Sequence, residues 1–229
     1  MSTYQRSAVL LVIACCQLAC GVASAEETVA PAREARLLAD LRQRGARYKL
    51  NSRQQVVKLD LSGMKLKETD LWSLNVFRQL GELSLAKTET TDATLSMLRK
   101  LPRLKALDLT GTRITNVGIW MLRDLTHLED LSLAETQIDD RALSSLRGLR
   151  YLKSLNLTKT RVTTIGLLQL ESLKRLESLN LTGTDLNDSV SILLKRLPAL
   201  KFVGLSGTQV TDYTVDRLRE AMVNTKIVR

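Results

Sequence analysis

One pattern recurs every 24 residues through most of this chain. Its clearest copy is KALDLTGTRITNVGIWMLRDLTHL, residues 105–128, in which Leu107 is the first strand leucine. The counterparts of Leu107 at the same interval are Leu59, Leu83, Leu131, Leu155, Leu179 and Val203. A short fixed period predicts a solenoid, in which each unit packs only against its neighbours. Solenoids present an extended surface, so the repeat predicts a binding or scaffolding role without naming the partner.

Each unit changes its hydrophobic period partway along. Leu107 and Leu109 alternate with outward-facing residues, which predicts a short strand, whereas Ile119, Leu122 and Leu125 follow at intervals of three, which predicts a short helix. With each buried aliphatic side chain contributing about 1.5 to 3 kcal/mol, the stacked units can offset their ordering entropy without disulfides. The residues expected to cap the helices are Asn116, Asp92, Asp140, Asp188 and Asp212.

A threonine column marks the bend after each strand. Its members are Thr88, Thr112, Thr136, Thr160, Thr184 and Thr208, and Met64 replaces it in the first unit. A turning backbone leaves polar groups that need partners, so we expect the hydroxyls to form a ladder of hydrogen bonds between neighbouring units. A row of nucleophiles is the less favoured interpretation, because no base lies nearby in the pattern.

The pattern L-x-L-x-x-T-x-I-x-D resembles the leucine-rich repeat family, in the form common in secreted bacterial proteins. The resemblance covers roughly residues 56–228, with Thr at the column where other branches carry Asn or Cys. It implies an α/β fold: a right-handed solenoid with a parallel sheet on its concave side and short helices on its convex side. Family members most often bind another macromolecule, so a protein partner is the implied one.

The sequence outside the repeats predicts caps and an export signal. We expect residues 1–25 to be a signal peptide, 26–55 a polar lead and helical cap, 56–224 seven repeats and 225–229 a cap strand around Ile227. The cap helix is expected to begin at Pro31, where a missing N–H costs nothing, and to end at Gly45. A solenoid exposes an apolar cross-section at each end, which such caps cover.

The signal is predicted from an apolar segment followed by a small-residue site. Arg6 precedes the apolar run 8–20, and cleavage is expected after Ala25, leaving an exported protein in the periplasm or outside the cell. The alternative is a lipid anchor at Cys15 or Cys20. A retained membrane span is disfavoured, because thirteen apolar residues fall short of the roughly 20 that a spanning helix needs.

Residues suited to catalysis or metal binding are scarce. His127 is the single histidine and no cysteine follows Cys20, so the usual zinc ligands are missing from the expected mature chain. We therefore predict no enzyme activity, no cofactor and no catalytic or metal-binding residue. The acidic residues Asp60, Glu82, Asp108 and Asp130 could hold a cation weakly, but a solvated strand face is the favoured interpretation because calcium loops draw most ligands from one segment.

Two surfaces remain as candidate binding sites. The first is the outward face of the predicted sheet, and its candidate partner-binding residues are Lys58, Asp60, Glu82, Ser84, Asp108, Asp130, Ser132, Asn156, Asn180 and Phe202. The second collects basic residues after the helices, where the helix dipole favours cations, and would bind a polyanion or an anionic envelope component. These residues are Arg99, Lys100, Arg103, Arg123, Arg147, Arg150, Lys174, Arg175, Lys195 and Arg196. Nucleic acid is disfavoured because stacking aromatics are not interleaved with the basic residues.

Two further columns predict stacking contacts. Charges of alternating sign, which should fix the register of neighbouring strands, occur at Lys105, Glu129, Lys153, Glu177 and Lys201. Trp72 and Trp120 share one helix column with Leu168 and Ile192, and this column should be partly exposed. It is interpreted as lateral cover between adjacent helices, with a sticky stripe for a partner as the alternative.

Overall fold

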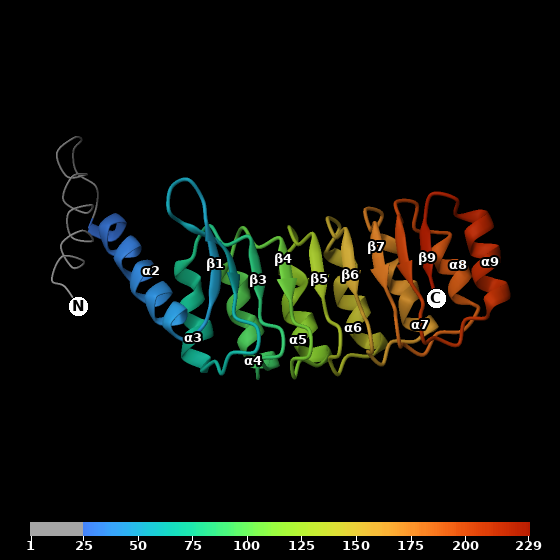
Figure 1. The fold of residues 1–229 in the computed structure, drawn as a ribbon, viewed down its shortest axis with the longest axis horizontal. Coiled ribbons are helices and arrows are strands. Elements are labelled where there is room, and N and C mark those ends of the chain that lie inside the picture. Colours follow the sequence, from blue (N-terminus) through green and yellow to red (C-terminus); the bar gives the residue numbers. More distant parts are fainter. Residues whose placement is uncertain (1–24) are drawn as a thin grey trace.

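The structure, a computed structural model, describes residues 25–229, so Cys15, Cys20 and the rest of the predicted signal segment before Ala25 lie outside the described residues. Nine strands form one open sheet and lie side by side in chain order (Figure 1). The strands are β1 (Arg47–Leu50), β2 (Val56–Asp60), β3 (Glu82–Ser84), β4 (Ala106–Asp108), β5 (Asp130–Ser132), β6 (Ser154–Asn156), β7 (Ser178–Asn180), β8 (Phe202–Gly204) and β9 (Lys226–Val228).

The register of the sheet follows the 24-residue period. From β2 onward every neighbouring pair is parallel, and Leu59 stands opposite Leu83, Leu107 opposite Leu131, and Val203 opposite Ile227. The predicted repeat strands are therefore confirmed. Strand β1 differs, because it pairs with β2 in the antiparallel direction and so closes the first edge of the parallel array.

Short helices cover the side of the sheet opposite its outward face, one for each unit (Figure 1). Most of them continue into a tight 3₁₀ turn, which shortens the return to the next strand. The α-helices are α2 (Ala25–Gln43), α3 (Glu68–Ser73), α4 (Asp92–Leu95), α5 (Asn116–Met121), α6 (Asp140–Ser145), α7 (Thr164–Leu167), α8 (Val190–Leu194) and α9 (Asp212–Ala221). The 3₁₀ turns are η1 (Leu74–Val76), η2 (Ser96–Lys100), η3 (Leu122–Asp124), η4 (Leu146–Gly148) and η5 (Leu168–Ser172). This alternation confirms the predicted fold class.

The core is a single stack of aliphatic side chains between the sheet and the helices. Leu107, Leu109, Ile119, Leu122 and Leu125 are all buried, as the two periods predict. The same positions are buried in the other units except at Ser191, which is half-buried, and Ala221, which is exposed. One continuous cluster joins Leu41 in α2 to Ile227 in β9. Each unit therefore depends on its neighbours for burial, which is the property expected of a solenoid.

The N-terminal helix begins earlier than the sequence predicts. Helix α2 starts at Ala25 and runs through Pro31, where a start was expected. An interior proline removes one helix hydrogen bond and crowds the carbonyl four residues earlier, so the turn before Pro31 has the least favourable backbone of this helix. At the other end Arg44 ties this cap to the first repeat, because its guanidinium lies 2.7 Å from the carboxylate of Asp70 and 2.9 Å from the carbonyl of Lys65.

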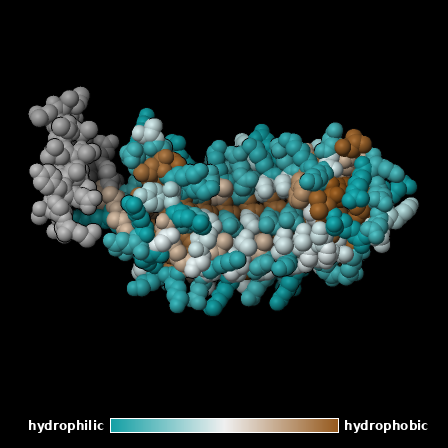
Figure 2. Space-filling view, viewed as in Figure 1, coloured by the Kyte–Doolittle hydropathy of each residue, from teal (hydrophilic) through white to brown (hydrophobic). Residues whose placement is uncertain are grey.

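Hydrophilic residues predominate along both long edges of the face that Figure 2 shows. A narrow hydrophobic stripe lies between them, and hydrophobic residues also gather near the C-terminal end. Among residues 25–229, no helix is both long and apolar enough to cross a membrane.

Candidate functional site on the concave face

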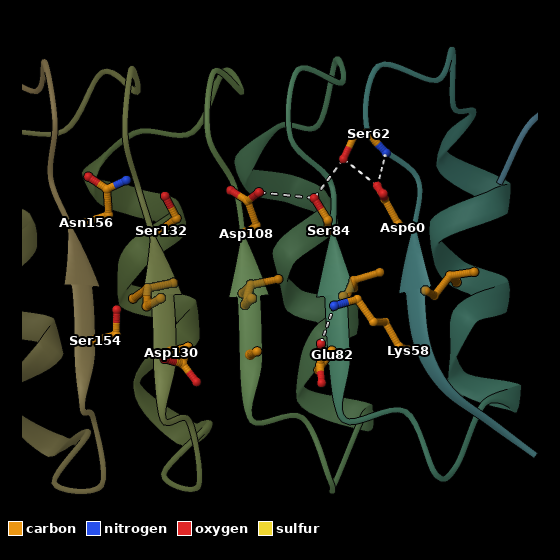
Figure 3. Close-up of a pocket in the computed structure, with 15 residues that line it drawn as sticks. Lys58, Asp60, Ser62, Glu82, Ser84, Asp108, Asp130, Ser132, Ser154 and Asn156 are labelled. Atoms are coloured by element: carbon orange, nitrogen blue, oxygen red, sulfur yellow. Dashed lines mark hydrogen bonds and ion pairs between the residues drawn. The ribbon is translucent and has the colours of Figure 1, made fainter. Parts of the chain in front are cut away.

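The outward face of the sheet, called here the concave face, holds a shallow depression of about 510 Å³. Five consecutive strands, β2 to β6, supply its lining (Figure 3). Eight of the ten predicted partner-binding residues line it: Lys58, Asp60, Glu82, Ser84, Asp108, Asp130, Ser132 and Asn156. Asn180 and Phe202 lie outside the depression, further along the same face on β7 and β8.

At its N-terminal end the depression is crossed by hydrogen bonds between strands (Figure 3). Lys58 donates to Glu82 at 2.6 Å. The hydroxyl of Ser84 lies 2.8 Å from that of Ser62 and 3.2 Å from an oxygen of Asp108. Acidic and hydroxyl groups are thus held in fixed positions, which lowers the entropy cost of binding a partner there.

Several acidic and amide side chains of this face also stabilise the turn that follows their own strand. An oxygen of Asp108 accepts hydrogen bonds from the backbone N–H and the hydroxyl of Thr110, at 3.0 and 2.6 Å. The side-chain oxygen of Asn156 likewise accepts from the backbone N–H and the hydroxyl of Thr158, at 3.1 and 2.6 Å. These bonds use one oxygen of each side chain. The second carboxylate oxygen of Asp108 accepts the hydrogen bond from Ser84, and the amide nitrogen of Asn156 has no hydrogen bond among the described residues. Both residues line the depression, so they have both a structural and a potential binding role.

Two carboxylates of this face have pKa values shifted in opposite directions. Desolvation works against the charge of Asp60, but hydrogen bonds from Ser62 and the guanidinium of Arg47 hold its pKa below the ordinary value. Desolvation raises the pKa of Asp130, and the neighbouring charge of Glu129 adds to the effect. A cationic partner would oppose both effects, so binding one should lower the pKa of Asp130.

The concave face changes character toward its C-terminal end. In place of acids, β6 and β7 present Ser154, Asn156, Ser178 and Asn180. On β8, Phe202 is half-buried between Ser178 on one side and Lys226 on the other. The face therefore offers an acidic half, a neutral polar half and one aromatic side chain at the end.

The buried threonine column corrects one prediction. Each of these hydroxyls donates to the carbonyl three residues earlier in its own repeat, as Thr136 does to Leu133 at 2.6 Å. The other members are Thr88, Thr112, Thr160, Thr184 and Thr208. The bonds are therefore within repeats, and the predicted ladder between units is wrong for this column. The threonine instead closes the bend where the chain leaves the sheet.

The ladder between repeats is formed by a different column. Asp92 accepts hydrogen bonds from the backbone N–H of Thr115, at 2.8 Å, and from its hydroxyl, at 2.5 Å. Asp140 binds Thr163 in the same way, at 2.7 and 2.6 Å, and Asp188 binds Thr211. The signal in the sequence was a pair of Thr, Asp or Asn residues near the start of each helix from α4 onward: Thr91-Asp92, Thr115-Asn116, Asp139-Asp140, Thr163-Thr164, Asn187-Asp188 and Thr211-Asp212.

The same contacts correct the predicted helix caps. Asn116, Asp92, Asp140, Asp188 and Asp212 were expected to be the capping residues. In α5, α6, α7 and α9 the side chain that caps the helix belongs to the residue before its first position, and the N-cap residues of α4 and α8 make no side-chain cap bond. Thr115 accepts from the N–H of Val117 at 3.3 Å, and Asp139 accepts from the N–H of Arg141 at 2.9 Å. The expected caps Asn116, Asp92, Asp140 and Asp212 instead occupy the first helical position, and Asp188 lies ahead of α8.

The predicted charge column is present at the start of the strands. Lys105 and Lys153 both lie next to Glu129, at 2.7 and 2.5 Å, and Lys201 lies 2.7 Å from Glu177. The hydrogen bonds from Lys105 and Lys153 lower the pKa of Glu129 to about 2. These pairs fix the register between strands, which is a structural role.

The exposed helix column and the single histidine lie where predicted. Trp72 and Trp120 are 53% and 51% exposed, and the guanidinium of Arg123 lies 3.7 Å from the ring centre of Trp120. Exposed His127 lies beside Tyr151, with ring centres 6.2 Å apart. Within residues 25–229, no group of three or more His, Cys, Asp or Glu side chains could hold a metal ion.

Comparisons with known proteins agree with this geometry. Residues 102–161 match the model of the leucine rich repeat. Internalin C2 of Listeria monocytogenes has a similar structure, with a TM-score of 0.63 and 24% identity over 76% of this chain and 70% of that one. An internalin (InlF) of the same organism has a TM-score of 0.56 and 22% identity, over 69% of this chain and 50% of that one. A leucine-rich repeat protein of Leptospira interrogans has a TM-score of 0.53 and 20% identity, over 69% of this chain and 39% of that one. A search of curated protein sequences finds no match.

Proposed function

Because the chain is a leucine-rich repeat protein, we propose that it is an exported, non-enzymatic interaction module that holds a protein partner against its concave face. Export is proposed from the apolar segment and the small-residue site before Glu26. The repeat fold supports the interaction role, because stacked repeats create the extended concave surface that such proteins use for binding.

The observation that carries the proposal is the open depression on the concave face. Its polar side chains come from five strands in fixed register, so their relative positions are set by the sheet and not by mobile loops. A site built on rigid elements binds without a large ordering cost. The convex side, by contrast, consists of short helices with separate exposed apolar side chains.

The charges of the face indicate the partner's chemistry. Asp60, Glu82, Asp108 and Asp130 carry negative charge, whereas Lys58 is the single basic side chain lining the depression and is paired with Glu82. Complementary charge steers association and excludes partners of like charge. We therefore expect a protein segment that places Lys or Arg over the acidic half and extends toward Phe202. A rigid aromatic side chain at the end of a polar face can serve as an anchor.

The test reverses charge where no described hydrogen bond is lost. Asp130→Lys with Ser154→Lys adds three positive charges to the depression, and neither side chain has a hydrogen bond among the described residues. The matched control, Glu220→Lys with Ser145→Lys, adds the same charge to helices on the convex side, and these two side chains likewise have no hydrogen bond among the described residues. Protein partners are captured by crosslinking from the exported fraction and identified by mass spectrometry.

We expect the concave variant to lose the partner that the wild type and the convex control both retain. Loss in both variants would attribute binding to net charge. Retention in both variants would contradict a role for the acidic half of the concave face. Export itself is tested by the intact mass of the protein, for which the proposal predicts an N-terminus at Glu26. A product that retains acylated Cys15 or Cys20 would instead show a lipid anchor.

A further inference from the structure

Nearly all the excess positive charge of the molecule lies on one edge. The helix-end edge is defined as the six loops that lead from a helix to the next strand, residues 75–81, 99–105, 123–129, 147–153, 171–177 and 195–201. These loops hold fourteen Lys or Arg and four Asp or Glu, a net charge of +10. This equals the formal net charge of the whole chain, so the remaining residues sum to zero.

The opposite edge has the reverse balance. The turn edge is defined as the seven segments that lead from a strand to the next helix, residues 62–68, 86–92, 110–116, 134–140, 158–164, 182–188 and 206–212. It holds six basic and nine acidic residues. Fields from the two edges therefore do not cancel, and an anion approaching the solenoid is drawn to the helix-end edge.

Most of the basic side chains on the helix-end edge have no anionic partner within the described chain. Of the ten that follow the helices, Arg99 and Arg123 pair with Asp124, and Arg196 pairs with Glu171. The other seven form no ion pair among residues 25–229, and all are exposed: Lys100, Arg103, Arg147, Arg150, Lys174, Arg175 and Lys195. Helix dipoles explain a preference for cations here, but not a surplus of this size along five successive loops.

The loops are arranged as a line. Neighbouring strands lie about 4.8 Å apart, so successive loops place their guanidinium and ammonium groups in a regular row along the solenoid. One column of this row contains His127, Tyr151 and Arg175 on consecutive loops. Arg175 lies 4.7 Å from the ring centre of Tyr151, and His127 lies on the other side of that ring. Charge and an ordered aromatic side chain thus occur together.

These features favour one class of ligand. A membrane surface would call for apolar side chains able to insert, and Tyr151 is the single exposed large hydrophobic residue of the helix-end edge in the described chain. A nucleic acid would call for several free aromatic faces, whereas the ring of Tyr151 already has neighbours. A linear row of cations, rich in Arg, matches a linear polymer with carboxylate, sulfate or phosphate groups along it.

We propose that the helix-end edge binds an anionic polysaccharide, which lies along the row of loops and contacts Arg147, Arg150 and Tyr151 near its centre. This surface is separate from the concave face, so a protein partner and the polysaccharide can be held at once. The proposal does not depend on the identity of the protein partner.

The test compares the two edges at equal net charge. Arg147→Glu with Arg150→Glu changes the charge of the helix-end edge by −4, and Arg113→Glu with Arg161→Glu makes the same change on the turn edge. All four side chains are exposed, and circular dichroism with thermal melting checks that both variants fold. Binding of heparin, polygalacturonate and neutral dextran is measured by calorimetry and by salt elution.

We expect the helix-end variant to lose at least about tenfold in affinity for both anionic polymers, because two contacts are removed and two repulsive charges added. The turn-edge variant should stay within about threefold of the wild type, and neutral dextran should not bind. Equal losses in the two variants would overturn the proposal, since only net charge would then matter. So would unchanged binding in the helix-end variant.

Two further arms test the choice of ligand. The protein's affinity is also measured for vesicles of phosphatidylglycerol with phosphatidylcholine and for single-stranded DNA. A higher affinity for either than for polygalacturonate would overturn the choice of polysaccharide. Tyr151→Ala should lower the affinity for polygalacturonate about two- to fivefold without changing the dependence of that affinity on salt, because a stacking contact carries no net charge. A change in the salt dependence with no loss of affinity would contradict the role of the ring.

Discussion

The two long edges of the solenoid use their polar residues in opposite ways. On the turn edge, Asp92 and Asp140 are bonded to threonines of the next repeat, and the buried threonine column closes each bend from within. On the helix-end edge, eight basic side chains, Arg78 and the seven named above, form no ion pair in the described residues. The difference separates the polar groups that hold the units together from those that are available to a partner.

A repeat fold needs such hydrogen bonds between neighbouring units along only one edge. The sheet already connects neighbouring units on the concave side, and the leucine stack fills the interior. The ladder on the turn edge satisfies backbone N–H groups that the bend would otherwise leave unpaired. On the other edge the charge column also links neighbouring units. Substitutions of the basic side chains outside that column should affect binding far more than stability.

The largest expected effect comes from packing a methyl group into the ladder. A Cβ atom on Gly166 would lie 2.2 Å from an oxygen and 2.6 Å from the Cβ of Asp140, so Gly166→Ala must displace the carboxylate from Thr163. We expect a loss of about 3 kcal/mol in the free energy of unfolding, from overpacking together with lost hydrogen bonds. Urea denaturation measures it.

The matched control lies on the helix-end edge. A Cβ on Gly148 would meet only the carbonyl of Arg123, at 3.7 Å, which is an ordinary contact. Gly148→Ala should therefore change the free energy of unfolding by less than about 0.5 kcal/mol. Equal effects of the two substitutions would break the distinction between the edges.

An intermediate effect is expected at the bend. Thr136→Val keeps the shape of the side chain but leaves the carbonyl of Leu133 without the hydroxyl that now donates to it at 2.6 Å. We expect a loss of about 1 to 2 kcal/mol. Thr208→Val should cost less, because Thr208 is only partly buried and lies in the last unit. An unchanged urea midpoint for Thr136→Val would remove the closing role of this column.

The smallest effect concerns the charge column on the helix-end edge. The pKa of Glu129, about 2 in the folded protein, lies below its ordinary value of 4.5 because Lys105 and Lys153 donate hydrogen bonds to it. A lowered folded pKa contributes stability above pH 4.5, and this contribution is lost as the pH falls from 4.5 to about 2.

Glu129→Gln should therefore lower the melting temperature slightly near neutral pH, where the wild-type ion pairs are intact, and this difference from the wild type should disappear as the pH falls toward 2. Melting temperatures between pH 2 and pH 7 provide the measurement, together with the titration of Glu129 by NMR. A titration midpoint near 4.5 would show that the lysines do not hold the carboxylate.

Most of the fold was predictable from the sequence, because the positions that become buried recur with the 24-residue period. Leu107 and its counterparts determine the strand register, and the switch from period two to period three locates each helix. The partners of individual hydrogen bonds were harder to predict from the sequence. Thr136 and Thr115 are both threonines near a bend, but the register within the turn decides that one bonds inside its repeat and the other to its neighbour.

The candidate site was only partly predictable for a related reason. Alternation along the strands identified the outward residues, including Asp130 and Phe202. The sequence did not show that Asp108 and Asn156 also stabilise their own turns, because that depends on the local bend after the strand. The depression likewise depends on which neighbouring side chains are bonded to one another.

The most direct test of this division of surfaces places a photo-crosslinking residue at one surface position on each. Ser132 represents the concave face, Arg147 the helix-end edge and Arg161 the turn edge. After irradiation in the presence of the exported fraction, we predict protein crosslinks from Ser132, polysaccharide crosslinks from Arg147 and neither from Arg161. Protein crosslinks from Arg161 with none from Ser132 would contradict the account, because the edge assigned to internal fastening would then be the binding surface.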